Sequence, residues 1–136
     1  MPTYRRSRTL QAGEERVFEY LADIRNLPRY VDRITSARSV GGDTVAVTAE
    51  EHGQTERGEA WLRVDRTARR IQWGSEEGND YSGTLDLHAD QDRTVVDLEV
   101  QTERTQADEI NRSMDATLDR IQEQIEADHA RKGTAG

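Results

Sequence analysis

The chain has 136 residues, with 19 Lys or Arg against 27 Asp or Glu, so its formal net charge at pH 7 is −8. This length is typical of one domain, and we expect residues 1–136 to form a single domain that is ordered from about residue 3 to 130, with a tail at 131–136. Hydrophobic residues make up 33% of the chain and charged residues 34%. This composition predicts a folded domain with a small core.

Several classes of protein are disfavoured by the same composition. The chain has no apolar stretch long enough for a membrane span or a secretory signal, which predicts a cytoplasmic protein without stable membrane insertion. The absence of cysteine excludes disulfides and thiolate chemistry. The acidic balance argues against a nucleic-acid partner, because phosphate binding needs clustered cations. Neither Glu51, His52 and Glu56 nor Asp90 and Asp92 has a recognised metal-ligand spacing, so we expect no metal, and nothing indicates a cofactor.

The first third of the chain predicts a strand followed by two short helices. Residues 4–10 suit a strand, and Gly13 precedes two acidic residues, which are favoured in the first turn of a helix. The apolar residues that follow recur at helical spacing: Val17, Phe18, Leu21 and Ile24. Asn26 and Pro28 suit the start of a second helix. Its apolar side would be formed by Leu27, Tyr30, Val31 and Ile34.

Between residues 35 and 104 the apolar period changes to two, as in strands of an antiparallel sheet that is covered on one face. The alternation is clearest around Val47, Leu62, Leu85 and Leu98. Turn-forming residues separate the runs at 41–43, 52–54, 65–67, 77–79 and 90–92. The region therefore predicts a six-stranded meander, or seven strands with the first one.

The last part of the chain predicts one long helix. Thr105 and Asp108 have the spacing of a capping box. One apolar stripe follows: Ile110, Met114, Leu118, Ile121 and Ile125. Basic residues at 131 and 132, followed by Gly133, suit its end. A helix of about 25 residues spans roughly 37 Å, enough to cross a sheet.

Residues 17–30, V-F-E-Y-L-A-D-I-R-N-L-P-R-Y, carry a resemblance to a known family. They resemble the early signature of the START/Bet v1-like superfamily, particularly its bacterial polyketide cyclase/dehydrase branch. The resemblance implies an α+β helix-grip fold, in which a curved antiparallel sheet of six to seven strands wraps around a long C-terminal helix and leaves a cavity between them. Small residues at inferred inward positions agree with such a cavity: Ala49, Gly58, Ala60 and Gly83.

Extending the inward alternation along each strand gives a candidate ligand-binding set: Ser36, Arg38, Glu56, Ala60, Leu62, Ile71, Trp73, Tyr81, Gly83, Leu85, Met114 and Leu118. Two simpler interpretations stay open. Trp73, Met114 and Leu118 would also suit a filled core, and Arg38 and Glu56 would suit a solvated strand end or an ion pair.

Candidates for catalysis are few. The phenol of Tyr81 would donate a hydrogen bond to a carbonyl oxygen that becomes an enolate, with Arg38 as a second donor. Of the three histidines, only His52 is a candidate, because it lies in a predicted hairpin that could reach the entrance of the cavity. His88 is expected on the solvent-facing side of the sheet, and His129 lies near the C-terminus.

These observations lead to one preferred hypothesis and two rivals. The preferred function is binding of a hydrophobic or aromatic small molecule of polyketide, lipid or quinone type between the sheet and the final helix. The first rival is a polyketide cyclase/dehydrase-like enzyme. The second is a partner-binding regulatory or stress-related module, which predicts that Leu27, Tyr30 and Val31 form an exposed docking patch. The oligomeric state, monomer or dimer, stays open.

Overall fold

Residues 2–31, 34–51, 53–75, 81–102 and 107–135 are described by a computed structural model, and side chains are described for these except at residues 51 and 128–135. The chain begins with β1 (Thr3–Leu10), α1 (Glu14–Ala22), a 3₁₀ turn η1 (Ile24–Asn26) and α2 (Leu27–Tyr30). Six further strands follow: β2 (Ile34–Gly41), β3 (Thr44–Glu51), β4 (Gln54–Asp65), β5 (Arg70–Ser75), β6 (Tyr81–Asp90) and β7 (Arg93–Thr102). The long helix α3 (Ala107–Ala135) ends the described chain.

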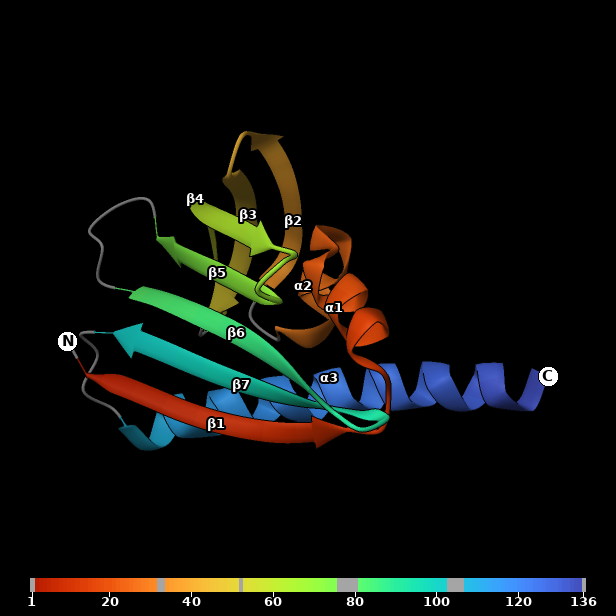
Figure 1. The fold of residues 1–136 in the computed structure, drawn as a ribbon. Helices are drawn as coiled ribbons and strands as arrows, with labels where there is room; N and C mark the ends of the chain where they lie inside the picture. The colour runs from red at the N-terminus through yellow and green to blue at the C-terminus, as the bar shows by residue number, and fades with distance from the viewer. Residues whose placement is uncertain (1, 32–33, 52, 76–80, 103–106, 136) are drawn as a thin grey trace.

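The seven described strands form one antiparallel sheet in the order β1-β7-β6-β5-β4-β3-β2. The first strand therefore pairs with the last, and β2 to β7 form the predicted meander. The sheet is strongly curved: β2 and β3 rise away from the plane of β1, β6 and β7, while α3 runs beside β1 (Figure 1). The predicted architecture of strand, short helices, meander and long helix is thus confirmed.

Cross-strand pairing shows which side chains share the inner face, the face of the sheet on which α1 and α3 pack. Leu98 pairs with Leu85, and Leu85 with Ile71. One step along the strands, Gly83 pairs with Trp73 and Trp73 with Leu62. Because directly paired residues point to the same face, these rows are continuous across the sheet. The period-two pattern of the sequence therefore predicted the inner face of β4 to β7 correctly.

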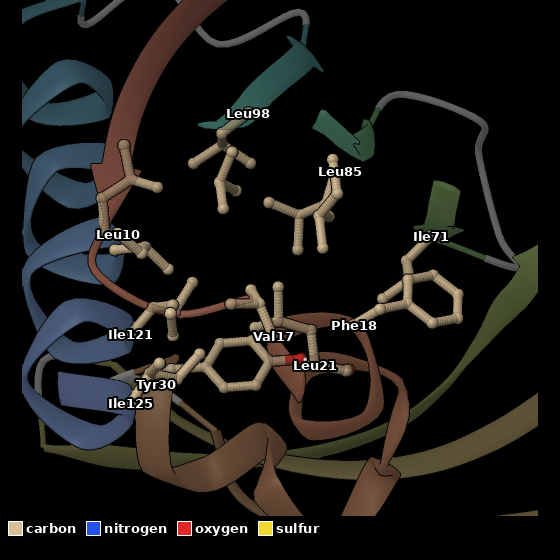
Figure 2. Packing of buried hydrophobic residues seen from close by; sticks show 14 of the residues in the cluster. Leu10, Val17, Phe18, Leu21, Tyr30, Ile71, Leu85, Leu98, Ile121 and Ile125 are labelled. Carbon is tan, nitrogen blue, oxygen red and sulfur yellow. Dashed lines mark hydrogen bonds between the residues drawn. The ribbon is translucent and has the colours of Figure 1, made fainter. Parts of the chain in front are cut away.

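The core forms where α1 and the apolar stripe of α3 meet β5, β6, β7 and the end of β1. Figure 2 shows Leu85 and Leu98 of the sheet pointing toward side chains of α1, with Ile121 and Ile125 of α3 beside them. The buried cluster consists of Leu10, Ala12, Val17, Phe18, Leu21, Tyr30, Ile71, Leu85, Leu87, Val96, Leu98, Val100, Met114, Leu118, Ile121 and Ile125. Apolar burial of this kind is the main stabilising contribution in a small domain.

The corner between α1 and α2 is held by the polar residues of the 17–30 signature. The buried Tyr30 hydroxyl donates to the Leu21 carbonyl oxygen over 3.0 Å. The Asn26 side-chain amide donates to the Tyr20 carbonyl oxygen, also over 3.0 Å. Asp23 accepts the Arg25 backbone N–H at 3.0 Å and so begins the 3₁₀ turn. Burial raises the pKa of Tyr30, which keeps its hydroxyl a neutral donor. The signature is therefore structural: it specifies this corner and contributes no reactive group.

Three details differ from the sequence-based expectations. Ile34 begins β2 and is not part of the second helix, because α2 ends at Tyr30. The turn η1, which the sequence did not predict, separates the two helices. Helix α3 continues to Ala135, past the expected end at Gly133, since a single glycine in a run without proline does not stop a helix. The predicted cap at Thr105 lies outside the described residues.

Candidate functional site

Part of the inner face is closed by the protein's own side chains. We call this part the closed half and define it by Ile71, Leu85 and Leu98 of the sheet together with Met114 and Leu118 of α3, which lie in the same buried cluster. Each of these side chains is between 1% and 4% exposed. Contact with other protein atoms therefore accounts for almost their entire surface. The predicted ligand-contacting residues Ile71, Leu85, Met114 and Leu118 thus belong to the packed core, as the simpler interpretation held for Met114 and Leu118.

The inner face of β3 and β4, together with Trp73 of β5, differs, because most of its apolar side chains stay partly exposed. Val45 of β3, at 4% exposed, is the buried exception. We call this part the open half and define it by Val47, Ala49, Gly58, Ala60, Leu62 and Trp73. Pairing of Val47 with Gly58 and of Ala49 with Glu56 aligns these positions on one face. Gly58 is exposed, and a Cβ atom built there would meet nothing within 4 Å. The open half is thus a partly exposed apolar surface with free space above Gly58.

Trp73 fills the space that Gly83 was expected to leave empty. A Cβ atom on Gly83 would lie 2.3 Å from Cζ2 of the Trp73 indole. The indole therefore lies flat across the β6 backbone, and Gly83 is required for this close approach. The prediction that Gly83 contributes to a cavity is wrong. The same contact fixes the orientation of Trp73, whose side chain is partly buried against the core next to Leu62.

Ser36 and Arg38 lie on the outer face, so the prediction that they line the site is wrong. The register between β2 and β3 shifts between Ile34 and Ser36, after which Ser36 pairs with Thr48 and Arg38 with Ala46. A shift of one residue turns every later side chain to the other face of the sheet. The inner positions of β2 are Ala37 and Ser39, which pair with Val47 and Val45.

Two polar candidates keep their predicted inner position. Tyr81 is 41% exposed and pairs with Thr102 of β7. In the part of the chain that the structure describes, its hydroxyl makes no hydrogen bond. Glu56 is exposed near the start of β4 and pairs with Ala49. Among the described residues, none forms an ion pair with Glu56. Of the two simpler interpretations of this residue, the described structure therefore fits the solvated strand end better than the ion pair.

The histidines give no catalytic arrangement that the structure describes. His52 lies outside the described residues. His88 is exposed and lies on the outer face, where its Nε2 is 3.0 Å from Oδ2 of Asp97. Nothing is described of the His129 side chain. No group of three or more His, Asp or Glu suited to a metal ion occurs within the described residues.

The turn between β4 and β5 closes the sheet against α1. Arg66 binds Glu19 at 2.5 Å and Arg69 binds Glu14 at 3.1 Å. Both guanidinium groups also lie over the ring of buried Phe18, 5.8 and 5.1 Å from its centre. These contacts anchor the C-terminal end of β4 against α1.

A concave feature lies between β1 and the first turns of α3, away from the open half. It is a polar cleft with a volume of about 400 Å³, lined by Arg6, Asp108, Asn111, Arg112 and Asp115. Arg6 pairs with Asp115 at 3.2 Å across it. The sequence analysis did not identify this cleft, because its residues come from two ends of the chain. Its mutually paired charges suit a hydrophobic molecule poorly, so the open half is the better candidate for such a ligand.

The docking patch that the partner-binding hypothesis requires is absent from α2. Tyr30 is 3% exposed, and Leu27 and Val31 are partly buried against the core. These side chains complete the packing of the α1–α2 corner and leave no broad apolar patch there. No helix of the described chain combines the length and apolar character of a membrane span.

Comparison with known proteins identifies relatives. The family model for polyketide cyclase/dehydrase and lipid transport matches residues 1–126. No curated protein sequence gives a match. Among solved structures, a protein from Thermus thermophilus is 23% identical, with a TM-score of 0.74 over 93% of this chain and 98% of the other.

Two further solved structures are similar at lower identity. The Zhui aromatase/cyclase from Streptomyces sp. R1128 is 17% identical, with a TM-score of 0.75 over 92% of this chain and 93% of the other. A START superfamily protein from Mycobacterium smegmatis is 12% identical, with a TM-score of 0.71 over 90% and 98%. At such identities the likeness shows the fold alone, and that fold is the START/Bet v1 helix-grip fold implied by the 17–30 signature.

Proposed function

Because the chain belongs to the polyketide cyclase/dehydrase and lipid transport family, we propose that it binds a hydrophobic or aromatic small molecule on the open half of its inner face. One observation carries this proposal: the apolar side chains of the open half are partly exposed on the inner face, although the closed half of the same face is fully packed. A ligand that lies on Leu62, Ala60 and Val47 would complete the burial that α3 leaves unfinished.

The expected driving force is apolar burial. Covering about 100 Å² of apolar surface would contribute roughly 2.5 kcal/mol. The indole of Trp73, held flat by Gly83, would add aromatic contact without having to be ordered first. The six residues that define this surface carry no polar side-chain group apart from the Trp73 N–H, so shape and aromatic character would determine affinity more than hydrogen bonds.

Tryptophan fluorescence tests the proposal directly, because the chain has two tryptophans on opposite faces of the sheet. Trp73 is on the inner face, whereas Trp61 pairs with Gly74 on the outer face. In Trp61→Phe, titration with polyketides, quinones, fatty acids and flavonoids is expected to change Trp73 emission in a saturable way for at least one class. The matched variant Trp73→Phe, which keeps Trp61, should give no response. Absence of saturable binding for every class would overturn the proposal.

A second candidate function, cyclase/dehydrase-like catalysis, is favoured by Tyr81 alone. Tyr81 is 41% exposed and its side chain lies on the inner face, two residues before Gly83, at the border of the open half. There it would donate a hydrogen bond to a carbonyl oxygen of the ligand as an enolate develops. Arg38 no longer supports this reaction, since it faces outward.

Tyr81→Phe separates the two functions. The phenylalanine keeps the ring and removes the hydroxyl, so binding should change little in both cases. A loss of turnover with retained binding would support the enzyme, and turnover equal to that of the parent would exclude Tyr81 as the donor.

A further inference from the structure

We propose that Glu56 makes the open half selective for charge, so that it binds elongated ligands with a neutral or cationic end more tightly than those with a carboxylate end. This inference rests on the proposed function, because it concerns the same surface. It narrows the ligand class from hydrophobic molecules in general to neutral or cationic aromatic amphiphiles.

The first support is the position of Glu56 relative to Trp73. Glu56, Gly58, Ala60 and Leu62 alternate along β4 on the inner face, and Leu62 is paired with Trp73. From position 56 to position 62 the strand advances by about 20 Å at most, at 3.3 Å per residue. The open half therefore has an aromatic end and an acidic end, with free space at Gly58 between them.

The second support is the lack of a compensating cation. Among the described side chains on the inner faces of β3 to β6, Glu56 is the one that carries a charge. The neighbouring Arg57 pairs with Thr48 and so points to the outer face. On β1, Arg6 and Arg8 face α3, where they bind Asp115 and Asp119. Along the described inner faces of β3 to β6, a carboxylate ligand would thus meet a negative charge and no cationic side chain.

The size of the effect follows from Coulomb's law. Two unit charges about 6 Å apart in water interact strongly enough to change a dissociation constant roughly threefold. The dissociation constants of two ligands that differ only in an ammonium or a carboxylate end would therefore differ about tenfold. The net charge of −8 also repels anions, but that contribution does not depend on where the charge sits.

Three probes that differ in one group test the inference: naphthyldecanol, naphthyldecylamine and naphthyldecanoate, below their aggregation concentrations. Their dissociation constants would be measured with Trp61→Phe at low salt and in about 1 M salt, where charges are screened within about 3 Å. The expected order of affinity at low salt is amine, then alcohol, then carboxylate, with about threefold steps that shrink in high salt. Glu56→Gln should bring the carboxylate to within twofold of the alcohol.

Glu59→Gln is the matched control. Glu59 is exposed on the same strand and pairs with Ala46 on the outer face, so this variant makes the same change in net charge on the other side of the sheet. It should leave the selectivity in place. Equal affinity for the three probes, or an equal effect of both substitutions, would overturn the inference and leave the proposed function standing. If none of the three probes binds, the inference fails, because it requires an aromatic amphiphile on this surface, whereas the proposed function is decided by the ligand panel.

Discussion

The two halves of the inner face share one alternating sequence pattern but have different environments. In the closed half, Leu98 and Leu85 lie in the same buried cluster as Leu118 of α3 and leave almost no exposed surface. In the open half, Leu62 and Ala60 occupy equivalent inward positions and stay partly exposed. The difference arises because α3 runs beside β1 while β3 and β4 curve away from it (Figure 1). Alternation alone therefore predicts an inner face, but it does not separate core from binding surface.

The largest expected effect comes from truncating one leucine in each half. Leu118→Ala should destabilise the fold by about 2–5 kcal/mol, since it removes a fully packed side chain. Leu62→Ala should cost only about 1 kcal/mol, because its side chain is partly exposed, and should weaken ligand binding instead. Denaturant unfolding measures the first quantity and a ligand titration the second. Equal destabilisation by both variants would show that the two halves are packed alike.

Two glycines on the inner face sharpen the same comparison. Gly83→Ala should cost about 1–3 kcal/mol and reduce binding, because its Cβ would displace the Trp73 indole. Gly58→Ala should be neutral or stabilise by up to about 1 kcal/mol, since its Cβ meets open space and alanine loses less backbone entropy than glycine. Thermal unfolding of both variants checks this. A destabilised Gly58→Ala would mean that the open half is already filled.

A substitution in the α1–α2 corner should lower the free energy of unfolding without changing ligand affinity. Tyr30→Phe removes the buried hydroxyl that donates to the Leu21 carbonyl oxygen, at an expected cost of about 1 kcal/mol. Ligand affinity should stay within twofold of the parent, because the corner contributes no side chain to the open half. A large loss of affinity with unchanged stability would assign the signature tyrosine a role in binding.

The smallest expected effect is a change in how the stability of the fold depends on pH, and it comes from Asp23. Hydrogen bonds from the Arg25 side chain hold the pKa of Asp23 below its usual value. A lowered folded-state pKa means that the ionised carboxylate stabilises the fold above about pH 3.9, and that this contribution is lost as pH falls. Asp23→Asn should therefore be slightly less stable than the parent near neutral pH, with a difference that shrinks in acid. Melting temperatures measured against pH check the direction, and a difference that grows in acid would contradict it.

The fold was largely predictable from the sequence, because strand alternation and the α3 stripe are local patterns. The inner face of β4 to β6 followed from alternation around Leu62, Trp73 and Leu85. A cytoplasmic location, a single domain and the lack of a nucleic-acid partner stay predictions.

The site was less predictable, because it depends on register and on contacts between strands. No residue type marks the shift after Ile34 that turns Ser36 and Arg38 outward. The packing of Trp73 on Gly83 depends on the pairing of β5 with β6, which sequence alternation does not specify. The candidate set omitted Val47, Ala49 and Gly58 of the open half, although the alternation of Val47 with Thr48 was visible in the sequence and Ala49 and Gly58 had been inferred to point inward.

Backbone amide NMR during a titration with naphthyldecanol tests the central claim most directly. We predict that the largest shifts occur at Gly58, Ala60, Leu62 and Trp73, with little change at Leu98 and Leu118. Shifts that are concentrated in the closed half or on the outer face, or the absence of any saturable shift, would contradict the claim that the open half receives the ligand.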